Sequence, residues 1–331
     1  MPVASESAAR GASAPEPADI STLPRVLGLF SAVTVVVGGI IGSGIFLKTG
    51  NVARALGSFG PIIGVWIGVG LVTLCGSLAL AELAAMAPRA GGPYVYLRMA
   101  YGKLPAFLWG WTEFWVVRTG SLGALSCASA IYLSQVVRLD RLGQELVAIA
   151  IVIGLSIINY LSTLWGASVQ NVTTVIKVGF LASIIVLPLV MGYTDIGNLD
   201  PVWPESASVD LWKGLGIAMV AVLWPYDGWI NIAPVAEEIR EPQRNLPLGL
   251  GLGMLIVIVV YVGANISYHL TLPMEQVAGS KAIASDVFQV LFGATGAKIA
   301  ALGVMCSTFG AVNSNMLTGP RIYFAMARDG L

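Results

Sequence analysis

Long apolar stretches alternate with short polar segments from residue 26 to the end of the chain. Eight of these stretches are long enough to cross a bilayer, because a transmembrane helix needs about 20 apolar residues. They comprise residues 26–47, 61–83, 104–134, 146–164, 167–192, 213–236, 247–272 and 298–320. The pattern predicts an all-α integral membrane protein whose two ends lie on the same side of the membrane.

The fourth and fifth spans are separated by a polar patch rather than by a charged loop. Residues 146–176 carry no charge and are too long for one span. The patch NYLSTLWGASVQN interrupts this stretch. We therefore expect two helices here, with a short connection inside the patch.

Two spans carry residues that disfavour a continuous helix at mid-membrane. The first contains VVVGGIIGSGIFLKTG, and the sixth contains AVLWPYDGWINIAP. Glycine lowers the cost of non-helical backbone angles, and proline removes a backbone donor and clashes with the preceding turn. Small residues also serve close helix packing, and GGIIGSG alone would fit that alternative. The matching break in the sixth span favours unwinding of both helices.

Interrupted helices at the first and sixth positions are typical of an inverted repeat with a binding site between the two halves. Such a repeat has five plus five spans. It predicts a first half at about 26–192 and an incomplete second half at about 213–331.

Composition supports a membrane location and excludes a role in binding nucleic acid. The 331 residues are 56% hydrophobic and 11% charged, with zero net charge and a mean hydropathy of +0.81. Residues 1–24 are rich in Ala, Ser, Pro and Glu, which predicts a disordered cytoplasmic tail ahead of a membrane domain at 25–331. A cytoplasmic amino terminus places nine Lys and Arg residues inside and seven outside, a weak bias in the usual direction.

No side chains cluster in sequence as an enzyme or metal site would require. The three cysteines, Cys75, Cys127 and Cys306, each lie in an apolar stretch, so we expect small buried hydrophobes. His269 is the only histidine, and no Asp, Glu or Cys residues surround it in sequence. We therefore expect neither enzymatic catalysis nor a metal or other cofactor.

An unwound first span would expose backbone groups of both polarities. We expect Ser43, Gly44 and Ile45 to offer N–H groups to a carboxylate, and Ile40 and Ile41 to offer carbonyl groups to an ammonium. Both charges of a zwitterion then fit one break.

The sixth span adds one ionisable group and several aromatic rings. Asp227 either caps the second half-helix, which we favour slightly, or pairs with a cation, and the two are compatible. Trp224, Tyr226 and Trp229 could wall a pocket, although aromatic residues in spans more often pack or form an interfacial belt.

Ionisable residues within the other spans need partners. Lys177 lies about ten residues into its span, too deep for snorkelling, so we expect an internal partner such as the freed carbonyls of the first helix. Glu113 and Arg118 lie about 140 degrees apart on an ideal helix, and each should therefore find a partner on another helix. We interpret them, and Glu82, as structural.

At these residues the chain resembles the amino acid-polyamine-organocation superfamily, and within it the L-type amino acid transporter group. Four motifs carry the resemblance: IIGSGIF at 40–46, PRAGGPYVYLRMAYG at 88–102, YDGWINIAPVAEEIREPQRNLP at 226–247 and STFGAVNSNMLTGPRIYFAMARDG at 307–330. The resemblance implies a LeuT-type fold that binds a neutral L-amino acid at the two breaks and often exchanges one amino acid for another. A bacterial member would lie in the inner membrane.

The resemblance also implies roles for individual residues. Ile40, Ser43, Gly44 and Ile45 match the backbone ligands of the family, and Lys177 matches a lysine that fills the space of a sodium site in sodium-independent relatives. Trp224 matches an aromatic gate, and Pro225 and Asp227 match contacts of the sixth helix. Gly42 and Gly228 are expected to organise the two breaks.

Three departures from the family qualify these expectations. Pro225 and Pro234 stand where alanine and an aromatic residue are expected. The loop SQVVRLDRLGQE lacks the cysteine that would bond a glycoprotein partner, so we expect no such partner. The family has about twelve spans, whereas the pattern here predicts eight. The main alternatives are therefore a truncated, transport-inactive membrane protein or an accessory subunit.

Overall fold

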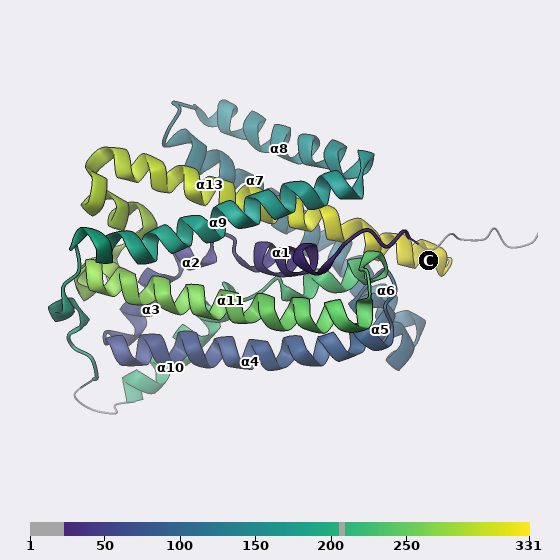
Figure 1. Cartoon of the computed structure of the whole chain (residues 1–331), viewed down its shortest axis with the longest axis horizontal. Helices are drawn as coiled ribbons and strands as arrows, with labels where there is room; N and C mark the ends of the chain where they lie inside the picture. Colours follow the sequence, from purple (N-terminus) through teal and green to yellow (C-terminus); the bar gives the residue numbers. More distant parts are fainter. Residues whose placement is uncertain (1–22, 205–208) are drawn as a thin grey trace, which may run out of the picture.

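The computed structural model describes residues 23–204 and 209–331, which form a helical bundle (Figure 1). The first half contains α1 Leu29–Ile40, α2 Gly44–Leu47, α3 Thr49–Leu56, α4 Phe59–Met86, α5 Pro93–Tyr101, α6 Lys103–Thr112, η1 Glu113–Arg118, α7 Thr119–Ser134, α8 Arg141–Leu161 and α9 Thr163–Met191. The remainder contains η2 Ile196–Leu199, α10 Val209–Leu223, η3 Trp229–Glu238, α11 Pro242–Thr271, α12 Met274–Gly279 and α13 Ile283–Arg328. The predicted all-α membrane fold is confirmed, whereas the predicted tail falls mainly on residues 1–22, outside the described residues.

Seven helical stretches in the described chain are long and apolar enough to cross a membrane. The predicted sixth span, 213–236, is not one of them, because it is divided into α10, a turn and η3. The predicted span 298–320 is the central part of the much longer α13. This helix bends at Gly293, whose φ of 61° is a conformation that favours glycine.

The polar patch between the fourth and fifth spans divides them as predicted. α8 ends at Leu161 and α9 begins at Thr163. Ser162 between them is extended, and its hydroxyl accepts a hydrogen bond from the Leu164 N–H at 3.2 Å. A serine cap of this kind explains why so short a connection suffices.

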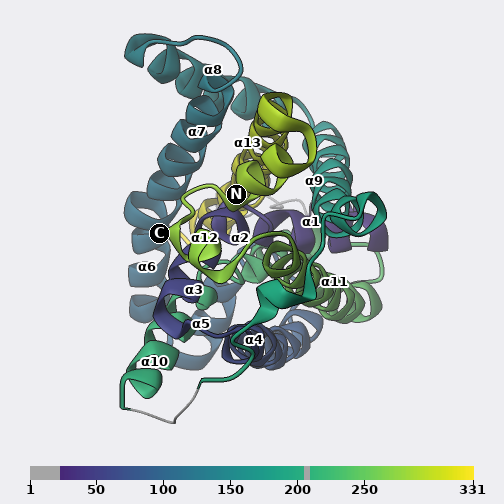
Figure 2. The same ribbon diagram turned by 90° about the vertical axis from the view of Figure 1, so that its left-hand side faces the viewer.

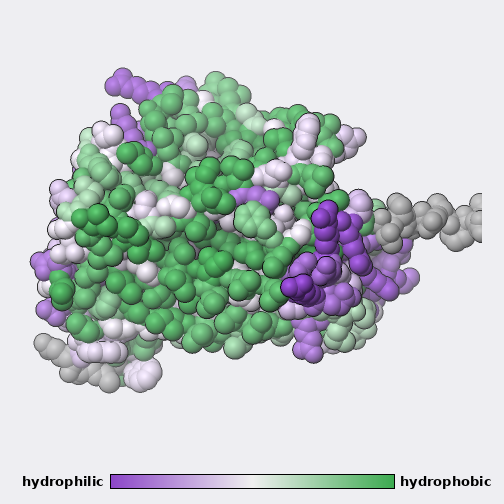
Figure 3. All heavy atoms as spheres, viewed as in Figure 1, coloured by the Kyte–Doolittle hydropathy of each residue, from purple (hydrophilic) through white to green (hydrophobic). Residues whose placement is uncertain are grey.

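α1 lies inside the bundle, where it packs against α9, α11 and α13, and α4 packs along α11 (Figures 1 and 2). The sequence of α1, LFSAVTVVVGGI, is apolar on all sides, which is typical of a helix enclosed by others. The face of the molecule seen in Figure 3 is apolar over its middle and more polar toward the two ends of the long axis. This band has the character of a surface that faces lipid.

Glu113 and Arg118 form an ion pair with each other, so our prediction of partners only on other helices is wrong. The Arg118 Nε lies 2.8 Å from the Glu113 Oε2. The cause is a π-helical turn at η1, whose wider winding brings residues five apart onto one face. Arg118 also donates to Asn315 and Thr318 of α13, at 2.8 and 3.3 Å.

The prediction that the three cysteines are buried is wrong. Cys75 and Cys127 are exposed and Cys306 is half-buried. In a membrane protein the outer surface faces lipid, so a small apolar side chain is equally compatible with that position.

Candidate functional site

The first and sixth spans are both interrupted within the bundle. α1 ends at Ile40 and α2 begins at Gly44, whereas α10 ends at Leu223 and η3 begins at Trp229. Gly228 adopts a φ of 110°, which lets the chain leave the second interruption. The glycines and the proline that predicted the breaks therefore lie at them.

The two interruptions touch each other through glycines. A Cβ atom at Gly44 would lie 2.8 Å from the Cα of Pro225, and one at Gly39 would lie 3.1 Å from the carbonyl oxygen of Gly228. One at Gly228 would lie 2.5 Å from the carbonyl oxygen of Gly39. This close backbone approach requires glycine at these positions and brings the polar groups of both breaks together.

Three successive backbone amides at the first break are unpaired. Within the described chain, the N–H groups of Ser43, Gly44 and Ile45 donate no hydrogen bond. Ser43 and Ile45 are also buried, at 5% and 0% exposure. A group of neighbouring free N–H donors can receive an anion such as a carboxylate.

The carbonyl of Ile41 is not free for a substrate, so this part of the prediction is wrong. It accepts hydrogen bonds from the Lys177 Nζ at 2.7 Å and from the Ser307 hydroxyl at 3.1 Å. The carbonyl of Ile40 accepts from the Gly42 N–H at 2.8 Å and lies 3.3 Å from the Tyr261 hydroxyl.

Lys177 makes the internal contacts that its position in the sequence demanded. Its ammonium donates to the carbonyl oxygens of Gly38 at 2.9 Å, Ile41 at 2.7 Å and Ser307 at 3.0 Å, and the residue is fully buried. An ammonium has three N–H donors, so all three are used. Lys177 thereby joins α9, the break of α1 and α13.

Asp227 does not cap the half-helix that follows it. Gly228 is the N-cap residue of η3, and no side chain caps this helix. The Asp227 carboxylate is exposed and accepts no hydrogen bond from the described residues. It is therefore available to a cationic group.

The three aromatic residues of the second break do not wall one pocket. The Trp224 side chain is half exposed, and the Lys48 Nζ lies 5.0 Å above its ring. Tyr226 is fully buried, and its ring centroid lies 5.9 Å from that of Trp66. Trp229 instead lies beside Gly76 of α4.

Trp66, Tyr261 and Ser307 also contact the breaks, although the sequence predicted no role for them. Trp66 and Tyr261 lie in apolar spans, where an aromatic residue carries no signal beyond packing. Ser307 opens the motif STFGAVNSN, so a polar residue in that span was a visible signal.

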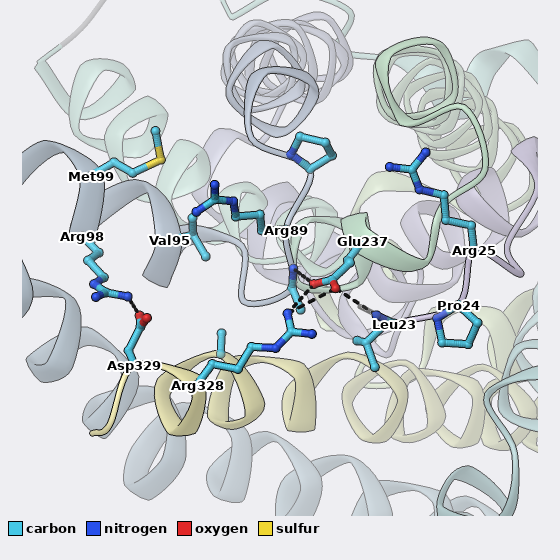
Figure 4. Close-up of a pocket in the computed structure, with 13 residues that line it drawn as sticks. Leu23, Pro24, Arg25, Arg89, Val95, Arg98, Met99, Glu237, Arg328 and Asp329 are labelled. Atoms are coloured by element: carbon cyan, nitrogen blue, oxygen red, sulfur yellow. Dashed lines mark hydrogen bonds and ion pairs between the residues drawn. The ribbon is translucent and has the colours of Figure 1, made fainter. Parts of the chain in front are cut away.

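A cavity of about 1030 Å³ opens at one end of the bundle, which we call the charged end (Figure 4). Its lining comes from the segment before α1, the α4–α5 connection, α5, η3 and the end of α13, and comprises Leu23, Pro24, Arg25, Pro88, Arg89, Ala90, Val95, Arg98, Met99, Glu237, Ala325, Arg328 and Asp329. None of these lining residues lies in the two interruptions. The cavity is therefore separate from the candidate site.

Glu237 joins four segments at the charged end. Its carboxylate accepts from the Leu23 and Ala90 N–H groups, each at 2.9 Å, and from Arg328 at 2.9 and 3.1 Å (Figure 4). Burial raises the pKa of Glu237, but these hydrogen bonds, with that from Arg328 the largest, outweigh it and lower the pKa. The neighbouring Glu238 pairs with Arg321 at 2.7 Å.

Glu237→Gln is expected to lower the melting temperature at neutral pH by several degrees, because a charged acceptor of buried donors is worth about 1–3 kcal/mol. The folded pKa lies below its ordinary value of 4.5, so this stabilisation is complete above pH 4.5 and is lost as pH falls through the folded pKa. The difference from the unmodified protein should therefore shrink on acidification. Glu145→Gln, which removes an exposed pair, is the control. A difference that is independent of pH would contradict the assignment.

Comparisons with known proteins agree with these features. A family model described as amino acid permease matches residues 27–331. The serine/threonine exchanger SteT of Bacillus subtilis (strain 168) is 34% identical over 306 residues, covering 92% of this chain and 68% of SteT. The human b(0,+)-type amino acid transporter 1 is 32% identical, covering 94% of this chain and 64% of that protein. Human large neutral amino acids transporter small subunit 2 is also 32% identical, covering 93% and 58%. The chain thus spans about two thirds of these relatives or less.

A solved structure shares the fold. It is Mhp1, a nucleobase-cation-symport-1 family transporter, in a closed conformation with bromovinylhydantoin bound. The TM-score is 0.64 at 17% identity, and the match covers 95% of this chain and 70% of that one. This similarity supports the LeuT-type bundle expected from the sequence.

Proposed function

Because this chain belongs to the amino acid permease family, we propose that the protein carries neutral L-amino acids across a membrane by exchange and without sodium. The observation that carries the proposal is the contact between the two interrupted helices. The free N–H groups of Ser43, Gly44 and Ile45 receive the substrate carboxylate. The Asp227 carboxylate receives its ammonium, and so does the Ile40 carbonyl, where the ammonium replaces the distant Tyr261 hydroxyl.

The named relatives support an amino acid substrate. SteT is a serine/threonine exchanger, and the human proteins are named for b(0,+)-type transport and for large neutral amino acids. A zwitterion matches the two breaks because opposite charges are offered within one short region. Trp224 stands at the edge of that region and serves as its gate.

The contacts of Lys177 support independence from sodium. Its ammonium takes up the carbonyl groups of Gly38, Ile41 and Ser307, which are the kind of oxygen ligands that a bound cation needs. A fixed positive charge there does for the break what a bound ion would otherwise do.

We assign the charged end to the cytoplasm and the protein to the inner membrane. Seven arginines of the described chain flank spans at this end: Arg25, Arg89, Arg98, Arg240, Arg244, Arg321 and Arg328. An excess of Lys and Arg marks cytoplasmic loops. No disulfide-linked partner is proposed, since the SQVVRLDRLGQE loop has no cysteine.

The test is uptake by liposomes that contain the purified protein, including any residues the gene encodes beyond Leu331. Each of the twenty amino acids is supplied outside in radiolabelled form, with unlabelled L-serine or L-leucine inside. We expect saturable uptake of several neutral L-amino acids and not of their D-forms. No uptake of any amino acid would contradict the proposal.

A further inference from the structure

We propose that Tyr261 is a positioning residue that stabilises the site when no substrate is bound. Its hydroxyl then donates a hydrogen bond to backbone carbonyl groups that would otherwise accept one from the substrate ammonium. This inference rests on the proposed function. Tyr261 belongs to α11, outside both interrupted spans, and is fully buried. Its hydroxyl oxygen lies 3.3 Å from the carbonyl oxygen of Ile40 and 3.1 Å from that of Pro225. One side chain thus reaches both breaks.

The two carbonyls stand at equivalent places in the two broken helices. Ile40 is the last residue of α1, and Pro225 follows the end of α10 at Leu223. Carbonyl groups at the carboxyl end of a helix carry partial negative charge and have lost their helical donors. Both therefore favour a donor, and a cationic donor most.

A phenol has one proton, so Tyr261 can donate to only one of these carbonyls at a time. The Ile40 carbonyl has a second donor, the Gly42 N–H at 2.8 Å. The Pro225 carbonyl receives no other hydrogen bond from the described residues. Pro225 is thus the group that depends on Tyr261 when no substrate is present.

Neighbouring side chains hold the phenol ring in place. Its centroid lies 5.6 Å from that of Trp66, nearly edge to face, and 5.2 Å from that of Tyr226. The Tyr226 hydroxyl donates to the Trp66 carbonyl at 3.0 Å, which fixes those two residues relative to each other. The Asn265 amide donates to the Tyr261 carbonyl at 2.8 Å. The hydroxyl therefore remains between the two breaks.

Substrate binding changes this balance. An ammonium has three N–H donors, so a bound amino acid can supply the carbonyls that Tyr261 serves in the empty site. Removal of the hydroxyl penalises the empty site more than the loaded one. The mutant should bind substrate more tightly and release it more slowly.

The experiment compares Tyr261→Phe with Tyr268→Phe in the reconstituted protein. Tyr268 lies seven residues later on α11, is also fully buried, and its hydroxyl has no hydrogen-bond partner in the described chain, so it is a matched control. Radiolabelled L-serine, L-threonine and L-leucine are the probes for equilibrium binding and exchange. We expect Tyr261→Phe to lower both KM and kcat about fivefold, the effect of about 1 kcal/mol from one hydrogen bond. Tyr268→Phe should change neither.

A second measurement does not depend on transport. Without amino acid, Tyr261→Phe should melt at a lower temperature than the unmodified protein. Saturating L-serine or L-leucine should raise the melting temperature of Tyr261→Phe by more than it raises that of the unmodified protein. Weaker substrate binding by Tyr261→Phe, or an unchanged KM and kcat, would overturn the inference. It would also be overturned if Tyr261→Phe failed to fold while Tyr268→Phe folded. Failure of the unmodified protein to exchange any amino acid would instead overturn the proposed function.

Discussion

Gly44→Val should abolish amino acid binding and leave the amount of folded protein in the membrane nearly unchanged. Even the first carbon of the new side chain would lie 2.8 Å from the Cα and 3.0 Å from the Cβ of Pro225. Contacts this short with backbone force the two breaks apart, which displaces the N–H groups of Ser43, Gly44 and Ile45. Loss of two or more charge-assisted hydrogen bonds, each worth about 1.5–3 kcal/mol, weakens binding by more than about a hundredfold.

The control for this variant is Gly68→Val on α4, where a Cβ would meet no atom within 4 Å. It should bind substrate normally. Equilibrium binding to detergent-purified protein, with size-exclusion chromatography as the test of folding, separates the two variants. Retained binding by a folded Gly44→Val protein would show that the substrate site lies elsewhere.

Lys177→Met should reduce the exchange rate by at least about tenfold, equivalent to 1.4 kcal/mol on the limiting step, with a smaller effect on substrate affinity. Methionine keeps most of the side-chain volume but removes the three hydrogen bonds to Gly38, Ile41 and Ser307. The break of α1 then loses its connection to α9 and α13. Because Lys177 contacts carbonyl oxygens and not the proposed carboxylate-binding N–H groups, turnover should suffer more than binding.

Lys213→Met is the matched control, because Lys213 is largely exposed and its ion pair with Asp210 is long, at 3.8 Å. Initial rates of exchange and equilibrium binding are measured for both variants. A Lys177→Met protein with normal turnover, or with failed membrane insertion as its only defect, would show that the lysine serves folding alone.

The sequence predicted those features that depend on residue type in a local stretch. Length and hydropathy located the spans, and the polar patch around Ser162 located the connection between α8 and α9. Glycine and proline located the interruptions near Gly44 and Pro225, since these residues carry their backbone preferences wherever they stand. A lysine deep in an apolar span demanded polar partners for the same reason.

Other features depend on contacts between distant segments, which residue type does not reveal. The wrong assignment of Ile41 arose because Lys177 and Ser307, from two other helices, already occupy its carbonyl. The pairing of Glu113 with Arg118 depends on π-helical winding, which an ideal-helix projection cannot show. The sequence gives no signal for Tyr261, because a tyrosine in an apolar span usually packs against its neighbours. Only the structure shows the partners of its hydroxyl group.

α13 connects the candidate site to the charged end. Ser307 on this helix donates to the Ile41 and Gly42 carbonyls at the first break. About four and six turns later on the same helix, Arg321 and Arg328 pair with Glu238 and Glu237. One helix thus contacts both the first break and the charged end.

Exchange in the absence of sodium is the most direct test of the proposed function. Proteoliposomes are loaded with unlabelled L-serine or L-leucine, all sodium is replaced by potassium on both sides, and entry of the labelled amino acid is followed with and without internal substrate. We predict rapid, saturable entry that requires internal amino acid, is not increased by a sodium gradient, and is absent with Gly44→Val. Entry that requires sodium, or that Gly44→Val leaves intact, would contradict the account.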